Sequence, residues 1–310
     1  MKYVFGVDIG GTTIKMGLLD DCGNPINKWE IPTDKSDKGA NILPDVAAAI
    51  ESELTKRSIL KSDVAGVGVG VPGPVDGNGV IHNAVNLGWG TFNVNEKLSA
   101  LTGLKTAAGN DANVAALGEM WKGGGQGYSS LVMVTLGTGV GGGIIVDGKI
   151  LSGSTGAGGE IGHIHVVDNE ECTCGCGGHG CLEQYASATG VSVLAKKALV
   201  DWNKPTCLTC EDLSAKAVFD GVKAGDELCD KVACEFGEIL GKGLAAIAGV
   251  VNPEAFVIGG GVSKAGDILM KYITPSFERF VFPGAKEAKM VLATLGNDAG
   301  MYGAAKMVLD

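Results

Sequence analysis

The stretch VFGVDIGGTTIKMGLL, residues 4–19, decides the fold. VFGVDI is apolar and rich in β-branched residues, GGTT is a turn sequence, and apolar residues alternate through IKMGLL. A second turn, DDCGNP, leads into a third short run, INKWEI. Short runs of this kind bounded by glycine-rich turns are typical of strands, so the first 31 residues predict three strands joined by two turns.

The same plan recurs at residues 131–151, which read LVMVTLGTGVGGGIIVDGKIL. Here LVMVTL, GGGIIV and KIL are the predicted strands, and GTG and DG are the turns between them. We interpret this as a degenerate internal repeat, which predicts two similar α/β domains. The remaining pattern predicts further strands at about 64–72, 105–108 and 255–262, and helices at about 42–56, 95–102, 112–122, 183–201, 211–223, 226–250 and 298–308.

Each repeat opens with a glycine-threonine turn, at residues 10–13 and 137–139. Such turns can aim successive backbone N–H groups at an anion. One copy alone is more simply a hairpin turn, but two copies in equivalent places favour phosphate binding. The chain has no GxxxxGK[ST] motif, and the first turn leads into a strand instead of a helix, which excludes a Walker P-loop and a Rossmann fingerprint.

Composition and charge argue against nucleic-acid-binding, membrane-spanning and secreted proteins. The 310 residues carry a formal charge of −10 and no Lys/Arg-rich run, so we expect no nucleic-acid partner. No stretch is long and apolar enough to span a membrane, and Asp8 interrupts the first apolar run too early for a signal peptide. We therefore expect a cytoplasmic protein, in which clustered cysteines more often bind metal or act in catalysis than form disulfides.

The segment CTCGCGGHGCLEQ, residues 172–184, holds four of the nine cysteines and one of the four histidines. Its cysteines could be disulfide partners, a redox switch or metal ligands, and the expected compartment favours metal. Cys207 and Cys210 form a lone CxxC, which we interpret as structural or mildly redox-sensitive.

Six motifs follow one another in an order that resembles the ROK family (repressors, open reading frames and sugar kinases), and within it the bacterial glucokinases. They are VDIGGTTIK at 7–15, GNDANVAALGE at 109–119, LGTGVGGG at 136–143, EIGH at 160–163, CGCGGHGCLE at 174–183 and IGGGVS at 258–263. The resemblance implies the two-domain α/β fold of the actin, hexokinase and Hsp70 ATPases, built from duplicated ribonuclease-H-like domains with a cleft between them. We expect a smaller domain at 1–109, joined by the C-terminal helix 298–310, and a larger one at 110–297.

The resemblance also implies a structural zinc ion bound by His163, Cys174, Cys176 and Cys181. Three thiolates and one imidazole complete a tetrahedral shell, which leaves no open position for water. Cys172, His165 and His179 remain rivals for a ligand position.

The activity that the resemblance implies is ATP-dependent phosphorylation of glucose to glucose 6-phosphate. Asp111 would be the general base. By itself, an aspartate before a helical run is more simply an N-cap, and either Asn110 or Asp111 could cap the helix predicted at 112–122. Besides Asp111, the implied sugar contacts are Asn86, Asn110, Glu160, His163 and Glu183. The zinc-bound loop would support the two glutamates.

For ATP, the implied contacts are Gly10, Gly11, Thr12, Thr13 and Lys15 in the first turn, Gly137, Thr138 and Gly139 in the second, and Gly259, Gly260 and Gly261 at the adenosine. Asp8 would orient Mg²⁺ through water. The family commonly forms dimers or tetramers, so we expect a homo-oligomer. The alternatives are a kinase for N-acetylmannosamine, fructose or allose, polyphosphate as the donor, or a non-catalytic sugar sensor.

Overall fold

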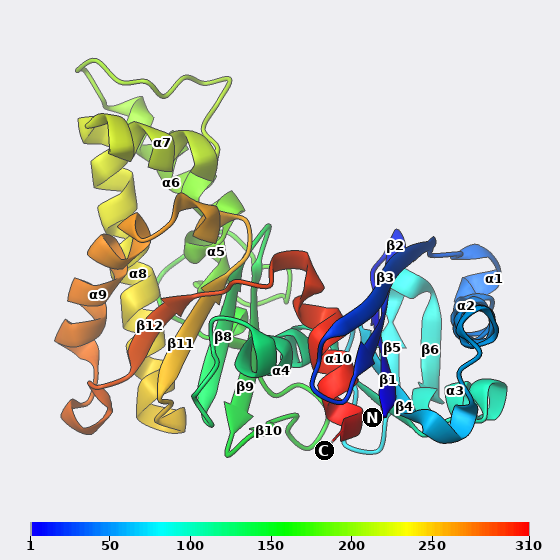
Figure 1. Cartoon of the computed structure of the whole chain (residues 1–310). Helices are drawn as coiled ribbons and strands as arrows, with labels where there is room; N and C mark the ends of the chain where they lie inside the picture. Colours follow the sequence, from blue (N-terminus) through cyan, green and yellow to red (C-terminus); the bar gives the residue numbers. More distant parts are fainter. Residues whose placement is uncertain (1, 310) are drawn as a thin grey trace. The chain divides into compact units, whose positions relative to one another are not determined.

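In the computed structural model, which describes residues 2–309, the first repeat folds into the predicted antiparallel meander (Figure 1). Two parallel strands extend the meander on the other side of its first strand, and the sheet order is β3-β2-β1-β4-β7. The strands are β1 (Tyr3–Ile9), β2 (Thr13–Asp20), β3 (Pro25–Pro32), β4 (Val64–Val71) and β7 (Thr106–Asn110). Asp8 pairs with Lys15 on one side and Gly70 on the other, so these residues share one end of the sheet.

The second repeat has the same strand order, β10-β9-β8-β11-β12. Its strands are β8 (Leu131–Leu136), β9 (Val140–Val146), β10 (Lys149–Ile150), β11 (Ala255–Gly259) and β12 (Lys289–Leu292). In both sheets the strands of the meander lie side by side in the order third, second, first. Two strands from later in the sequence extend the sheet beyond the first strand. The internal repeat predicted from residues 131–151 is therefore confirmed.

Glycines let the C-terminal helix α10 (Ala299–Leu309) lie directly on the first sheet. A Cβ atom on Gly6 would overlap the carbonyl oxygen of Met301, and one on Gly68 would overlap that of Ala304. Helix α4 (Asp111–Lys122) approaches α10 in the same way, since a Cβ on Gly118 would meet the carbonyl oxygen of Ala299. Part of the high glycine content thus serves close packing of backbone on backbone.

A buried carboxylate fixes the chain just before α10. Glu119 of α4 is fully buried and accepts hydrogen bonds from the backbone N–H groups of Gly124, Thr294 and Leu295. Three donors on one carboxylate compensate its burial.

The chain divides into two compact units. One comprises residues 2–131, 143–159 and 294–309 of the described chain, and the other comprises 132–142 and 160–293. This division differs from the expected boundary at 109 and 110, because α4 groups with α10. Within the first unit, α2 (Ile42–Arg57) and α3 (Val94–Thr102) contact each other, and a hairpin of β5 (Val80–Ala84) and β6 (Trp89–Asn93) follows the loop after β4.

Several helix predictions need correction. The predicted helix 183–201 is two helices, α5 (Glu183–Ala186) and α6 (Ala188–Val200), because Ser187 is extended and caps α6 by accepting from Gly190 N–H. Helix α7 (Ala215–Ala224) begins four residues after the predicted position, at its N-cap Ser214. The predicted strand 255–262 ends at Gly259, where the chain turns at Gly260. Helix α8 (Glu227–Val251) lies within one residue of its prediction, whereas α9 (Ile268–Phe280), which contains Pro275, was not predicted.

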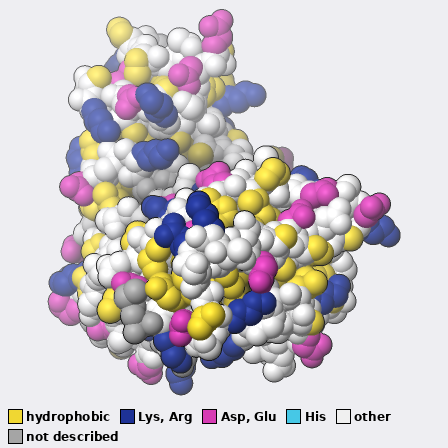
Figure 2. Space-filling model, turned by 45° about the vertical axis from the view of Figure 1, so that its right-hand side comes forward, with side chains coloured by type: hydrophobic (Ala, Val, Ile, Leu, Met, Phe, Trp, Pro, Cys, Tyr) yellow, Lys and Arg dark blue, Asp and Glu magenta, His cyan; other side chains and the backbone are white. Residues whose placement is uncertain are grey.

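The surface agrees with the composition. On the face shown in Figure 2, Lys and Arg side chains are interspersed with Asp and Glu side chains. Among the described residues, no helix combines the length and the apolar character needed to cross a membrane.

Candidate functional site

The first glycine-threonine turn is a tight connection between β1 and β2. The N–H of Gly10 donates to the carbonyl of Thr13 at 3.0 Å, and the hydroxyl of Thr33 donates to the carbonyl of Gly10 at 2.8 Å. A Cβ on Gly11 would meet nothing within 4 Å, and Thr12 is exposed. The tip of the turn can therefore be approached by a ligand. Lys15, on the strand that follows, donates to the carbonyl of Asn297 at 3.0 Å.

Asp8, at the end of β1, is a mostly buried carboxylate near Asp111. Burial raises its pKa to about 6, the charge of Asp111 adds to this, and Lys15 opposes it. A Cβ on Gly300, in the first turn of α10, would collide with the Asp8 carboxylate, so glycine is needed there. Two carboxylates in a poorly hydrated place repel each other, and a divalent cation would relieve that repulsion.

Asn110 is the N-cap of α4, and Asp111 is the first helical residue. The Asn110 side-chain oxygen accepts from the N–H groups of Ala112 and Asn113, and its amide donates to Gly73 at 3.1 Å. The sequence had allowed either Asn110 or Asp111 as the cap. Because Asn110 caps the helix, the Asp111 side chain is not needed for that purpose, although one of its oxygens accepts from Ala112 N–H at 2.8 Å.

The second turn contacts one of the predicted sugar ligands. The N–H of Gly137 donates to the carbonyl of Gly139 at 3.0 Å, and Glu183 accepts from the N–H of Val140 at 3.1 Å. A Cβ on Gly139 would overlap the Glu183 carboxylate. Glycine at 139 therefore allows the carboxylate of Glu183 to lie directly against this turn.

The four predicted metal ligands lie together. One nitrogen of His163 and the sulfurs of Cys174, Cys176 and Cys181 are all within 4.8 Å of one another. The Cys176 and Cys181 sulfurs are 3.7 Å apart, and Cys174 Sγ lies 3.7 Å from His163 Nδ1 and from Glu183 Oε1. Burial and the neighbouring Cys176 and Cys174 thiols raise the pKa of Cys181 to about 12. Three sulfurs and an imidazole at this spacing fit a tetrahedral zinc site.

The three rival ligands point elsewhere. His165 uses Nδ1 on the carbonyl of His179 and Nε2 on Asp168, at 2.8 and 3.0 Å. His179 Nδ1 lies 3.1 Å from the carbonyl of Glu170. Cys172 is exposed and lies outside the group of four. Hydrogen bonds from the Tyr185 hydroxyl and the Cys172 N–H lower the pKa of Glu170 to about 2, so an ionised carboxylate orders this loop.

His163 joins the metal cluster to a second carboxylate. Its Nδ1 faces the sulfur of Cys174, and its Nε2 lies 4.0 Å from Glu160. One nitrogen can thus bind a metal while the other faces outward beside Glu160. Both side chains are partly exposed, at 36% and 58%. Glu160, His163 and Glu183 therefore all border the cysteine cluster.

The glycines at the end of β11 lead into a small hollow, which Gly261 borders. Gly260 has φ +85°, and a Cβ there would overlap the backbone of Leu136, so only glycine fits. Gly261 borders a cavity of about 190 Å³, whose other walls come from α7 and from the turn after Gly261. The α7 residues, among them Phe219 and Lys216, carried no sequence signal for a site, because only tertiary packing brings α7 to these glycines.

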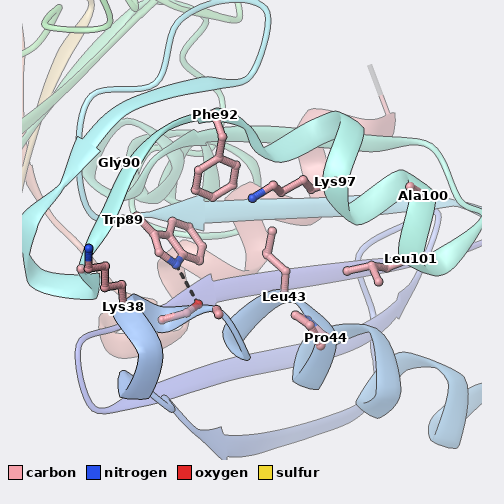
Figure 3. Close-up of a pocket in the computed structure, with 12 residues that line it drawn as sticks. Lys38, Leu43, Pro44, Trp89, Gly90, Phe92, Lys97, Ala100 and Leu101 are labelled. Carbon is pink, nitrogen blue, oxygen red and sulfur yellow. Dashed lines mark hydrogen bonds between the residues drawn. The ribbon is translucent and has the colours of Figure 1, made fainter.

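Asn86 lies exposed between β5 and β6, two residues before Gly88, which lines a pocket of the first unit. This pocket, of about 500 Å³, is lined by Trp89, Phe92 and Leu43 (Figure 3). The Trp89 indole N–H donates to the carbonyl of Gly39 at 2.9 Å, and the Lys97 ammonium lies 3.9 Å from the centre of the Phe92 ring. Among residues 2–309, no polar contact of Asn86 assigns it to a sugar.

Comparison with known proteins identifies the family. The profile of the ROK family matches residues 4–310. The chain is a member of the ROK family. This ROK protein is 45% identical to a glucokinase of Halalkalibacterium halodurans, over 99% of the chain and 95% of that relative. It is 34% identical to a glucokinase of Streptomyces coelicolor, over 100% and 98% of the two chains.

A solved structure agrees with the family assignment. A ROK family glucokinase from Streptomyces griseus, crystallised with glucose and AMPPNP, is 34% identical and superposes with a TM-score of 0.74, covering 98% of each chain. The two-domain ATPase fold shared with actin and hexokinase, which the motifs predicted, is therefore confirmed for this ROK protein.

Proposed function

We propose that this protein is a hexose kinase that transfers the terminal phosphoryl group of ATP to the 6-hydroxyl of glucose. The observation that carries the proposal is similarity along nearly the whole length to proteins named glucokinases, one of them crystallised with glucose and an ATP analogue. Transfer to a sugar hydroxyl needs a base, neutralised phosphates and an acceptor held in line.

Asp111 is the proposed base. It is the first residue of α4, directly after the N-cap Asn110, and its carboxylate would accept the proton of the attacking hydroxyl. The helix dipole favours a negative charge at this position. Asn110 would donate to the sugar with the amide hydrogen that is not bound to Gly73.

The metal-binding assignments follow from the donor sets. His163, Cys174, Cys176 and Cys181 would hold zinc, which would fix the loop that carries Glu183 and orient Glu160. Asp8 would orient Mg²⁺, which neutralises phosphate charge in such transfers. Glu160 and Glu183 would accept hydrogen bonds from sugar hydroxyls, and His163 would donate from Nε2.

We assign the phosphates of ATP to the turns at 10–13 and 137–139, and the adenosine to Gly259–Gly261 with the adjacent hollow. Lys15, held by the carbonyl of Asn297 in this structure, would turn toward phosphate. Asn86 remains a proposed sugar contact on the resemblance alone, as does assembly into a dimer or tetramer.

The test is ADP release from Mg·ATP with glucose, N-acetylmannosamine, mannose, fructose and allose. We expect turnover chiefly with glucose, and an Asp111→Ala variant with kcat reduced roughly 10²–10⁴-fold, the range for loss of a general base. Asp45→Ala is the matched control, because Asp45 lies in the first turn of α2 and is exposed.

Three results would contradict the proposal in whole or in part. Turnover chiefly with another sugar would show that glucose is not the preferred substrate. A kcat of Asp111→Ala within a few-fold of the wild-type kcat would show that Asp111 is not the general base. No turnover with any sugar in zinc-loaded protein would favour a sugar sensor.

A further inference from the structure

Outside the His163 cluster, a second set of metal-ligand side chains lies where the segment after α6 meets the start of α8 (Figure 1). Cys207, Asp226 and Cys229 each present a ligand atom, and these atoms are within 4.8 Å of one another. The two sulfurs are 3.7 Å apart. Two thiolates bound to one tetrahedral zinc ion at about 2.3 Å would be about 3.8 Å apart, so the spacing fits a shared cation.

The carboxylate of Asp226 is already fixed in place. Its Oδ1 accepts from the Cys229 N–H at 3.0 Å and the Thr206 hydroxyl at 3.1 Å, and its Oδ2 accepts from the Cys207 N–H at 2.6 Å. Each carboxylate oxygen has about two lone-pair sites, so Oδ2 can still bind a cation. Hydrogen bonds of this kind orient a ligand, as the outer groups around metal sites do.

The backbone makes room for the two sulfurs. Gly221 of α7 is buried, and a Cβ at this position would overlap Cys229 Sγ and lie 2.7 Å from Cys207 Sγ. Only glycine at 221 therefore lets both sulfurs lie against α7. Cys229 is buried and Cys207 is exposed, so the group is anchored on α8 and open to solvent on one side.

The sequence has a matching pattern. Residues 207–210 read CLTC and residues 226–229 read DELC, with 15 residues between the two pairs. Two short pairs of ligands at this separation are typical of zinc sites, here with aspartate in one of the four positions. The CxxC thus has a partner pair, DxxC, which the sequence alone does not mark as a ligand pair because its first residue is not cysteine.

We propose that Cys207, Asp226 and Cys229 form a second metal site for a thiol-binding divalent cation such as Zn²⁺, with Cys210 or water as the fourth ligand. The cation would attach the segment 201–214 to the N-terminal end of α8. A redox-active thiol pair fits less well, because reactive thiolates are found in electropositive surroundings and this pair shares its place with a carboxylate.

The experiment measures the number of zinc ions per chain by elemental mass spectrometry. The protein is purified with a thiol-free reductant and then dialysed against a buffer in which Zn²⁺ is the only added metal ion. Cys207→Ala, at an exposed position, should lose one equivalent relative to wild type. Cys234→Ala, an exposed cysteine of α8, is the matched control and should lose none. Cys207→His should retain part of the equivalent, because imidazole also binds zinc.

A Cys176→Ala background separates this site from the His163 cluster. If the proposal holds, Cys207→Ala lowers the zinc content equally in both backgrounds, whether or not the first cluster binds zinc. Equal zinc in wild type and Cys207→Ala, with unchanged circular dichroism, would overturn it. So would a Cys207–Cys229 disulfide in protein purified without reductant, seen as a mass lower by two hydrogens, if that protein binds no additional zinc after reduction.

Discussion

Asp8, the residue proposed to orient Mg²⁺, lowers the stability of the fold when it is ionised. Its pKa is raised from 3.8 to about 6, chiefly by burial and then by Asp111. Because the folded-state pKa lies above the unfolded one, the fold favours the protonated acid. The favourable contribution is complete below about pH 4 and is lost as the pH rises to 6 and beyond.

We therefore predict that Asp8→Asn stabilises the protein above pH 6 while it abolishes activity. A shift of this size corresponds to about 3 kcal/mol, so the free energy of unfolding should rise by up to that amount at pH 8. The difference from wild type should shrink between pH 6 and pH 4. Urea denaturation without added Mg²⁺ measures it, with the exposed Asp63→Asn as control. Asp8→Asn protein that is less stable than wild type at pH 8 would refute the account.

For other residues, the structure decides roles that the spacing of residues in the motifs leaves open. GNDAN allowed either Asn110 or Asp111 as the N-cap, and the structure assigns the cap to Asn110. EIGH did not show which nitrogen of His163 faces the cysteines, since that depends on the ring orientation, and here it is Nδ1. The choice of cap also depends on the Asn110 amide, which donates to the distant Gly73, and the orientation of the His163 ring depends on its packing, so the residue pattern could not predict either.

At the scale of elements, the β5–β6 hairpin is hydrogen-bonded to a segment, residues 37–39, whose backbone is strained. Asp37 and Lys38 have φ of +46° and +58°, a region that costs non-glycine residues free energy. Next to them, the carbonyl of Gly39 accepts the indole N–H of buried Trp89. The hydrogen bond links the hairpin to the segment that precedes α2, and both residues line the pocket in Figure 3.

Trp89→Phe should destabilise the protein by about 1–3 kcal/mol, because it leaves the Gly39 carbonyl without this donor and enlarges the pocket. Trp202→Phe is the matched control, since the Trp202 indole N–H is buried with no described partner. Removing an unsatisfied donor should cost little stability or even improve it. Guanidinium denaturation followed by circular dichroism compares the two, and equal losses would argue against the hydrogen bond.

At the scale of the whole molecule, helix α10, from the C-terminal end of the sequence, packs on the first sheet. It lies on glycines of β1 and β4, and its first turn touches Asp8 through Gly300. Its position thus couples the C-terminus to the proposed phosphate end of the sheet.

We predict that Gly68→Ala lowers the free energy of unfolding by about 1–3 kcal/mol or more, because the new methyl group would overlap the Ala304 carbonyl. Gly77→Ala is the control, since a Cβ there meets nothing within 4 Å. Activity of Gly68→Ala should fall as well if α10 moves away from Asp8. The urea midpoint and the glucose-dependent rate measure the two effects. A Gly68→Ala midpoint equal to that of Gly77→Ala would show that α10 can move at no cost.

The sequence by itself determined the two meanders and most of the helices, and its resemblance to the ROK family implied the four residues of the His163 cluster. The meanders and helices depend on local patterns, alternating apolar residues and turn glycines, which act over a few residues of chain. Only the tertiary structure decided the break at Ser187, helix α9 with its Pro275, the pocket beside Trp89 and the meeting of Cys207 with Asp226 and Cys229. Those features depend on packing between segments far apart in sequence, where burial outweighs local preference.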